Sequence, residues 1–194
     1  MDHYFIDNPD LTSHERILEL ELSDTYFSFV TNTGLFSNKQ VDRGSVRLLK
    51  NMPPMEGGLL DMCCGYGVLG IVLAKINPVT LTMSDINLRA LTYAKLNADR
   101  NKVQAEIIHS NCFEAISGKF DHIVLNPPIR AGKEVVYRLY NESISFLSPG
   151  GSLYVIVFKQ RGAKSSFKAL SEIYPSCEVL DKSGGYYVIQ CAKM

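Results

Sequence analysis

The sequence lacks the features that place a chain in a membrane or in an oxidising compartment. None of its apolar runs approaches the length of a membrane span, about 20 residues. It does not begin with a basic stretch followed by an apolar core, so no signal peptide is predicted. Its five cysteines are odd in number and show no C-x-x-C spacing. We therefore expect reduced, mostly buried cysteines, no metal site, and a cytoplasmic protein.

The chain also has no net charge, because 20 Lys and Arg balance 20 Asp and Glu over 194 residues. This excludes a whole-protein basic field of the kind that attracts nucleic acid. Any nucleic-acid binding must then rest on a local basic patch. An enzyme that contacts such a substrate only briefly is still compatible with this balance.

The organisation changes near residue 50. Residues 1–50 are predicted to be an N-terminal extension, with a strand at 26–30, a turn at Thr33-Gly34 and a helix at 42–50. Residues 51–194 are predicted to be the main domain. In it, strands are expected at 59–63, 80–84, 105–109, 120–125 and 152–158, and helices at 68–76, 88–100 and 133–147.

Strand–helix alternation of this kind predicts a mostly parallel sheet with helices on both faces. The last segments differ, because residues 178–180 and 186–191 flank Lys182-Ser183-Gly184-Gly185. They predict a hairpin that ends the sheet antiparallel. The expected fold class is thus α/β, with a Rossmann-like sheet of seven strands.

A glycine-rich turn follows the first expected strand of the main domain. Asp61 precedes Gly65 and Gly67, and Gly70 completes a G-x-G-x-x-G pattern. Glycines there allow a sharp turn and close approach to a ligand. Asp85 ends the next strand, where it can accept hydrogen bonds from ribose hydroxyls. Both features suit an adenosine-containing cofactor, either NAD or S-adenosylmethionine.

Two observations favour S-adenosylmethionine over NAD. Asp61 can face the ammonium group of the methyl donor, whereas a pyrophosphate would be repelled by a carboxylate. The chain also contains no Tyr-x-x-x-Lys pair, one common dyad for hydride transfer. Asn111, which follows the third strand, could hydrogen-bond the adenine. Ile86 and Cys112, neighbours of these residues, and Asn126 complete the predicted donor site.

The tetrapeptide Asn126-Pro127-Pro128-Ile129 follows directly on the fourth strand. Two prolines stiffen the backbone and remove N–H donors, which leaves carbonyl acceptors. An amide beside such carbonyls can hold an –NH₂ group and direct its lone pair toward a methyl donor. Asn126, Pro127 and Pro128 are the predicted catalytic residues.

Taken together, the turn after Asp61, Asp85 and Asn126-Pro127-Pro128 resemble class I methyltransferases that modify exocyclic amines. The segments 33–37, 42–45, 126–133 and 185–189 are similar to the "methyltransferase small" domain, whose best-known members are ribosomal RNA guanine-N2 methyltransferases. The resemblance spans about residues 4–193. It implies donor binding by Asp61, Gly65, Gly67, Asp85 and Asn111, and methylation of guanine N2 in ribosomal RNA or a ribosomal particle by Asn126 with Pro127.

The residues that would contact the substrate are marked by weaker sequence patterns than those of the donor site. Phe36 is a candidate for stacking on the target base, and Ile129 stands where many relatives have an aromatic residue. Arg130 and Lys133 could contact phosphates, together with basic residues that follow the fifth strand (Lys159, Arg161, Lys164 and Lys168).

Three other functions are compatible with parts of the pattern. A protein glutamine N-methyltransferase is a close alternative, because the Asn-Pro-Pro segment suits a side-chain amide as well. An NAD-dependent oxidoreductase would fit the glycine pattern alone. A non-catalytic binding module would keep the fold, although intact Asp85 and Asn126 argue against it. The sequence does not determine the oligomeric state.

Overall fold

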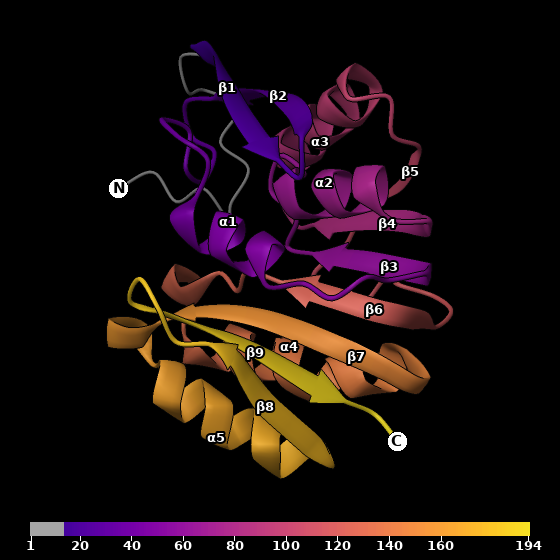
Figure 1. Ribbon diagram of the computed structural model, residues 1–194, viewed down its shortest axis with the longest axis vertical. Helices are drawn as coiled ribbons and strands as arrows, with labels where there is room; N and C mark the ends of the chain where they lie inside the picture. The colour runs from indigo at the N-terminus through magenta and orange to yellow at the C-terminus, as the bar shows by residue number, and fades with distance from the viewer. Residues whose placement is uncertain (1–13) are drawn as a thin grey trace.

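The computed structural model describes residues 14–194 (Figure 1). Residues 1–13, where a signal peptide was not predicted and where the predicted 1–50 extension begins, lie outside the described residues. None of the helices in the described part is long and apolar enough to cross a membrane.

A seven-stranded sheet forms the centre of the molecule, in the order β5-β4-β3-β6-β7-β9-β8. The five strands from β5 to β7 are parallel, and β9 is antiparallel to both of its neighbours. Their bounds are β3 Gly57–Met62, β4 Val79–Asp85, β5 Ala105–His109, β6 Phe120–Leu125, β7 Leu147–Phe158, β8 Ser176–Asp181 and β9 Tyr186–Ala192. The predicted mostly parallel sheet with an antiparallel C-terminal hairpin is confirmed.

Helices cover both faces of this sheet, as predicted. Apolar side chains of α1, α2 and α3 pack on one face, and those of α4 and α5 pack on the other. Consecutive strand residues such as Leu59 and Leu60 belong to opposite faces, and both are fully buried. The helices are α1 Arg43–Lys50, α2 Val68–Ile76, α3 Leu88–Arg100, α4 Lys133–Phe146 and α5 Ala163–Ile173, with short 3-10 turns η1 Ile129–Ala131 and η2 Lys159–Arg161.

A separate hairpin of β1 (Glu15–Leu22) and β2 (Thr25–Asn32) lies against α3 and α2. Its two-residue turn places Ser23 and Asp24 at φ 50° and 57°, the conformation that suits tight hairpins. Asn97 of α3 pairs with the backbone of Val30, accepting from its N–H at 2.7 Å and donating to its carbonyl at 2.9 Å. The helix thereby supplies the hydrogen bonds that a neighbouring strand would give.

The prediction that all five cysteines are reduced is wrong for Cys177 and Cys191. These residues lie directly opposite each other in β8 and β9, and a disulfide joins them. The remaining three, Cys63, Cys64 and Cys112, are free thiols. The hairpin was predicted, but its register, which sets these two residues 14 apart in the sequence opposite each other, was not.

Candidate active site

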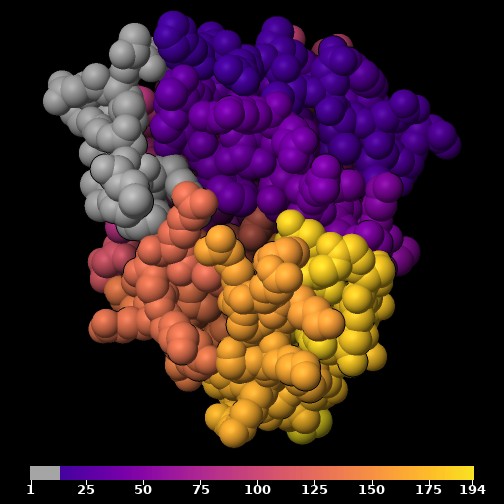
Figure 2. Space-filling model, turned by 90° about the vertical axis from the view of Figure 1, so that its left-hand side faces the viewer, coloured from indigo at the N-terminus to yellow at the C-terminus, as the bar shows by residue number. Residues whose placement is uncertain are grey.

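The site lies at the carboxyl ends of β4, β3 and β6, which are neighbours in the sheet. In parallel sheets, crevices outside these ends are the usual binding places. Figure 2 looks at this edge and shows the surface hollowed where the indigo and purple N-terminal half meets the orange and yellow C-terminal part. Two adjoining cavities open here, and both are lined by Leu35, Phe36, Asp42, Asn126 and Pro127.

The first cavity is bounded by the turn between β3 and α2. Gly65 has φ +57°, and nothing lies within 4 Å of a Cβ built on it, so the backbone leaves room for a ligand. Gly67 has φ +91° and is packed instead, because its Cβ would come 2.8 Å from Ile71 Cδ1. Gly65 lines the first cavity, whereas Gly67 shapes the turn behind it without lining it.

Asp61 is the most unusual group of the first cavity. Its side chain is 1% exposed, and its Oδ2 accepts from the Gly70 N–H at 2.8 Å. Its Oδ1 is buried with no hydrogen-bond partner among the described residues. Burial raises the pKa of Asp61 to about 7, against the lowering effect of the Gly70 N–H, and the charge of Asp85 raises it further. A buried oxygen of this kind calls for a partner, which a bound water molecule or a donor group of a ligand can supply.

Asp85 closes β4 and holds the glycine turn. Its Oδ2 accepts from the Gly65 N–H at 2.8 Å and its Oδ1 from the Asn87 N–H at 3.0 Å. Burial raises the pKa of Asp85, against these backbone hydrogen bonds. A carboxylate has about four acceptor positions in total, so Asp85 can still accept from a further donor such as a ribose hydroxyl. Ile86, which is 43% exposed, lines the cavity beside it.

The carboxyl side chains that line the first cavity are not balanced by any basic side chain of the described residues. Asp42, Asp61 and Asp85 line it, and no Lys or Arg of the described chain does. Such a surround favours a cationic ligand and disfavours a pyrophosphate. In the described residues no group of three or more His, Cys, Asp or Glu could hold a metal ion.

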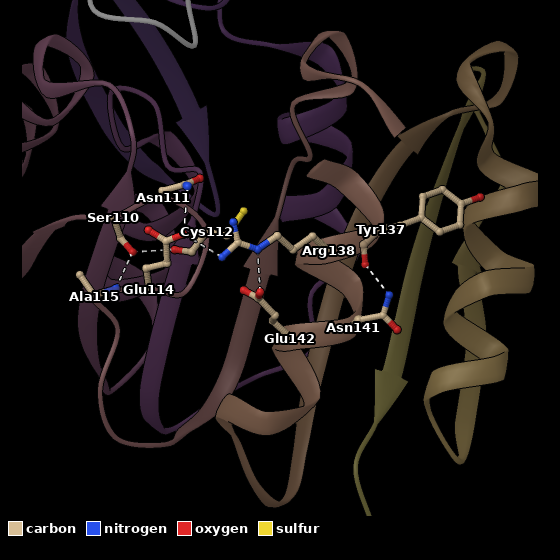
Figure 3. Close-up of polar contacts among 9 residues, drawn as sticks. All are labelled: Ser110, Asn111, Cys112, Glu114, Ala115, Tyr137, Arg138, Asn141 and Glu142. Atoms are coloured by element: carbon tan, nitrogen blue, oxygen red, sulfur yellow. Dashed lines mark hydrogen bonds and ion pairs between the residues drawn. The ribbon is translucent and has the colours of Figure 1, made fainter. Parts of the chain in front are cut away.

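Asn111 and Cys112 line neither cavity. The Nδ2 of Asn111 donates to Glu114 Oε1 at 3.1 Å, and Arg138 of α4 contacts the same oxygen at 3.0 Å (Figure 3). Arg138 also bonds Glu142 at 2.7 Å, so the loop after β5 is tied to α4. Cys112 is buried in the core on the α4 face. The predicted contact of Asn111 with adenine stays a prediction.

Asn126 stands between the two cavities at the end of β6. Its Nδ2 donates to Asp42 Oδ2 and to Ser45 Oγ, each at 3.0 Å. Its Oδ1 has no hydrogen-bond partner among the described residues. The carbonyls of Pro127 and Pro128 each accept one backbone N–H, from Ile129 and Ala131 at 2.8 Å. They are thus less open than predicted, although each oxygen keeps a second lone pair.

The second cavity combines aromatic, aliphatic and basic side chains. Phe158 and Tyr186 meet at 5.0 Å between ring centroids, and Arg130 and Arg161 provide positive charge. Of the predicted substrate residues, Phe36, Ile129 and Arg130 line this cavity, and the exposed Lys133 lines neither. Phe158, Tyr186, Asp42 and Ser45 were not predicted from the sequence as individual site residues. Asp42, Ser45 and Tyr186 lie in the segments 42–45 and 185–189, which resemble the family only as segments.

Comparison with known proteins identifies relatives over most of the chain. The family described as "Methyltransferase small domain" matches residues 26–190. An uncharacterised protein of Bacillus subtilis, YbxB, is 35% identical over 100% of this chain and 99% of its own length. A ribosomal RNA small subunit methyltransferase C of Photorhabdus laumondii is 34% identical over 84% of this chain, and that of Aeromonas hydrophila is 42% identical over 61%.

The chain spans only 50% and 35% of these two methyltransferases. Among solved structures, the T. thermophilus 16S rRNA N2 methyltransferase RsmC, in complex with AdoMet and guanosine, matches with a TM-score of 0.83. It is 24% identical, and the match covers 96% of this chain and 52% of that one. This likeness shows the fold.

Proposed function

The chain belongs to the methyltransferase small domain family, and on this premise we propose that it methylates an exocyclic amino nitrogen of a base in ribosomal RNA, with guanine N2 as the acceptor. The family makes it an S-adenosylmethionine-dependent methyltransferase. The observation that supports the acceptor chemistry best is the orientation of Asn126, whose amide hydrogens face Asp42 and Ser45.

The first cavity fits S-adenosylmethionine, which supplies a methyl group on a positively charged sulfur when bound. Asp61 Oδ1, buried without a partner, would accept from the ammonium of the amino-acid part. Asp85, beside Ile86, would accept from ribose hydroxyls. Three carboxylates and no basic residue in the described lining match a ligand with two positive centres. The same charges weigh against NAD, the alternative that the glycine pattern allowed.

The second cavity fits the acceptor base. Asn126 Oδ1 can accept a hydrogen from an amino group, and the free lone pair of the Pro127 carbonyl can accept the other. This contact would direct the nitrogen lone pair into the first cavity and stabilise the positive charge that develops on nitrogen. No strong general base is required, because the proton can leave to water after the transfer.

Features of the second cavity favour a nucleotide over a glutamine side chain. Aromatic faces from Phe36, Phe158 and Tyr186 suit stacking on an unstacked base, worth about 1–3 kcal/mol per base. Arg130 and Arg161 can pair with phosphates. A protein acceptor remains an outcome of the experiments below.

Replacing Asn126 tests this mechanism. In Asn126→Ala, transfer of labelled methyl to ribosomal RNA should fall about 100- to 1000-fold. The dissociation constant for S-adenosylmethionine should stay within about threefold, because Asp61 and Asp85 are unchanged. Asn141→Ala is a matched control, since this exposed asparagine bonds only within α4 (Figure 3). Wild-type transfer by Asn126→Ala would contradict the mechanism.

A further inference from the structure

Two acceptors determine how the Asn126 amide is oriented. Asp42 Oδ2, a carboxylate oxygen, can only accept. Ser45 donates its single hydroxyl hydrogen to the same Asp42 oxygen at 3.2 Å, so Ser45 Oγ acts as an acceptor toward Asn126. Both hydrogens of Asn126 Nδ2 are thereby used, and an inverted amide would set oxygen against oxygen.

This arrangement limits what Asn126 can offer to a substrate. Only Oδ1 is left, and it can only accept a hydrogen bond. A group presented to it must therefore be a donor, such as an amino group. A ring nitrogen or a carbonyl oxygen with lone pairs only would leave Oδ1 unpaired, which disfavours its binding.

The side chain of Asp42 is fixed in place by the first turn of α1. It caps α1, where its Oδ2 accepts from the Ser45 N–H at 2.7 Å. Gly44 has no side chain, and a Cβ there would lie 2.9 Å from both Asp42 Oδ2 and Tyr186 Cε1. The carboxylate and the Tyr186 ring therefore close over Gly44, next to the second cavity.

We propose that Asp42 and Ser45 are positioning residues for methyl transfer, which hold the Asn126 amide so that its Oδ1 meets the acceptor amine. The inference rests on the proposed function of Asn126. The negative charge of Asp42 also polarises the amide through the hydrogen bond, which makes Oδ1 a stronger acceptor. Asp42 acts through Asn126 and need not touch the substrate.

Asp42→Ser separates this role from helix capping. Serine caps helices about as well as aspartate, but its shorter side chain withdraws the acceptor from Asn126. We expect kcat to fall about 10- to 100-fold, the size of effect that small misplacements of reacting groups produce. Because Asp42 also lines the first cavity, the dissociation constant for S-adenosylmethionine should rise as well, but by a smaller factor than kcat falls. Asp42→Asn should recover part of the rate, because an amide oxygen can replace Oδ2.

Ser45→Ala is a second variant that does not threaten folding, since alanine is the best helix former. It should lower kcat about 3- to 10-fold, because one hydrogen bond of about 1 kcal/mol is lost. The decisive measurement is the double variant, because residues that act through one group are not additive. In the Asn126→Ala background, neither Asp42→Ser nor Ser45→Ala should reduce the residual rate further.

The outcomes separate the two ideas. If Asn126→Ala is inactive and Asp42→Ser transfers methyl at the wild-type kcat, the positioning role is overturned and the proposed function stands. Equal losses from Asp42→Ser with and without Asn126 also overturn it, because Asp42 then acts independently. If Asn126→Ala is fully active, the proposed function fails first.

Discussion

Asp61→Asn replaces a buried carboxylate by an amide of nearly the same shape. The amide oxygen can still accept from the Gly70 N–H, as Oδ2 does at 2.8 Å in the wild type. What disappears is the titration of the carboxyl group. Burial raises the pKa of Asp61 from 3.8 to about 7 in the folded protein without its donor. The difference between wild type and variant therefore isolates the effect of this one proton.

The raised pKa predicts the sign and size of a pH effect on stability. Below pH 3.8 the carboxyl is protonated in both states and makes no difference. Between this value and about 7, the folded state keeps the proton and the unfolded state loses it. The free energy of unfolding then falls by about 1.4 kcal/mol per pH unit. The total loss is about 4 kcal/mol, complete above the folded-state pKa.

Urea denaturation of both proteins between pH 4 and pH 8, without donor, measures this effect. The stability of the wild type relative to Asp61→Asn should decline over the window, and the variant should show no such component. Donor binding, measured by calorimetry in the same series, should tighten in the wild type as the pH rises toward about 7, because the ionised carboxylate attracts the ammonium. In Asp61→Asn it should be weak and free of this pH dependence.

Two results would refute the reasoning about Asp61. The first is a wild type whose stability relative to the variant rises or stays level between pH 4 and pH 7. The second is a variant that binds S-adenosylmethionine as tightly as the wild type at pH 7. The first would contradict the raised pKa, and the second would contradict the contact with the donor.

Three further substitutions test other parts of the structure. Gly67→Ala should lower the free energy of unfolding by about 1–3 kcal/mol, because φ is +91° and the new Cβ meets Ile71; a loss below about 0.5 kcal/mol in urea denaturation would contradict this. Asn97→Ala should cost about 2–4 kcal/mol by leaving the backbone of Val30 unpaired, and an unchanged denaturation midpoint would argue against that pairing. Arg161→Ala should weaken RNA binding and reduce its salt slope by about one, and an unchanged slope would remove it from the phosphate contacts.

The sequence was most informative where local chemistry sets the boundaries. The predicted helices 68–76 and 88–100 match α2 and α3, because Gly67 and Asn87 stand at their N-caps and Asn87 Oδ1 accepts from the Ala90 N–H. The strands at 105–109 and 120–125 also match. These elements are short apolar runs flanked by turn residues. The hydrophobic periodicity and the flanking turn residues are enough to predict their bounds.

Two elements were missed for identifiable reasons. β1 shows alternation in Leu18-Glu19-Leu20-Glu21-Leu22, so its period was present in the sequence. Its structure is decided by its pairing with β2, which in turn packs on α3, and both contacts are tertiary. α5 begins at Ala163 and contains Lys164 and Lys168, which were interpreted only as part of a basic surface rim, and its apolar face is narrow.

The sequence predicts at which edge of the sheet the site lies. It does not predict which side chains of the site contact one another. The carboxyl ends of parallel strands bring Asp61, Asp85 and Asn126 to one edge, which follows from topology alone. The bond between Asn126 and Asp42 joins residues 84 apart in the chain, and no local pattern specifies it. Likewise, the register of β8 and β9 places Cys177 opposite Cys191.

The acceptor is the central claim, and identifying the methylated nucleoside tests it most directly. The purified protein would be incubated with labelled S-adenosylmethionine and, separately, with small ribosomal subunits, free ribosomal RNA, transfer RNA, DNA and total protein. Labelled RNA would be digested to nucleosides and analysed by mass spectrometry. We predict label in ribosomal RNA as N2-methylguanosine. Label in protein glutamine, or in no nucleic acid at all, would contradict the account.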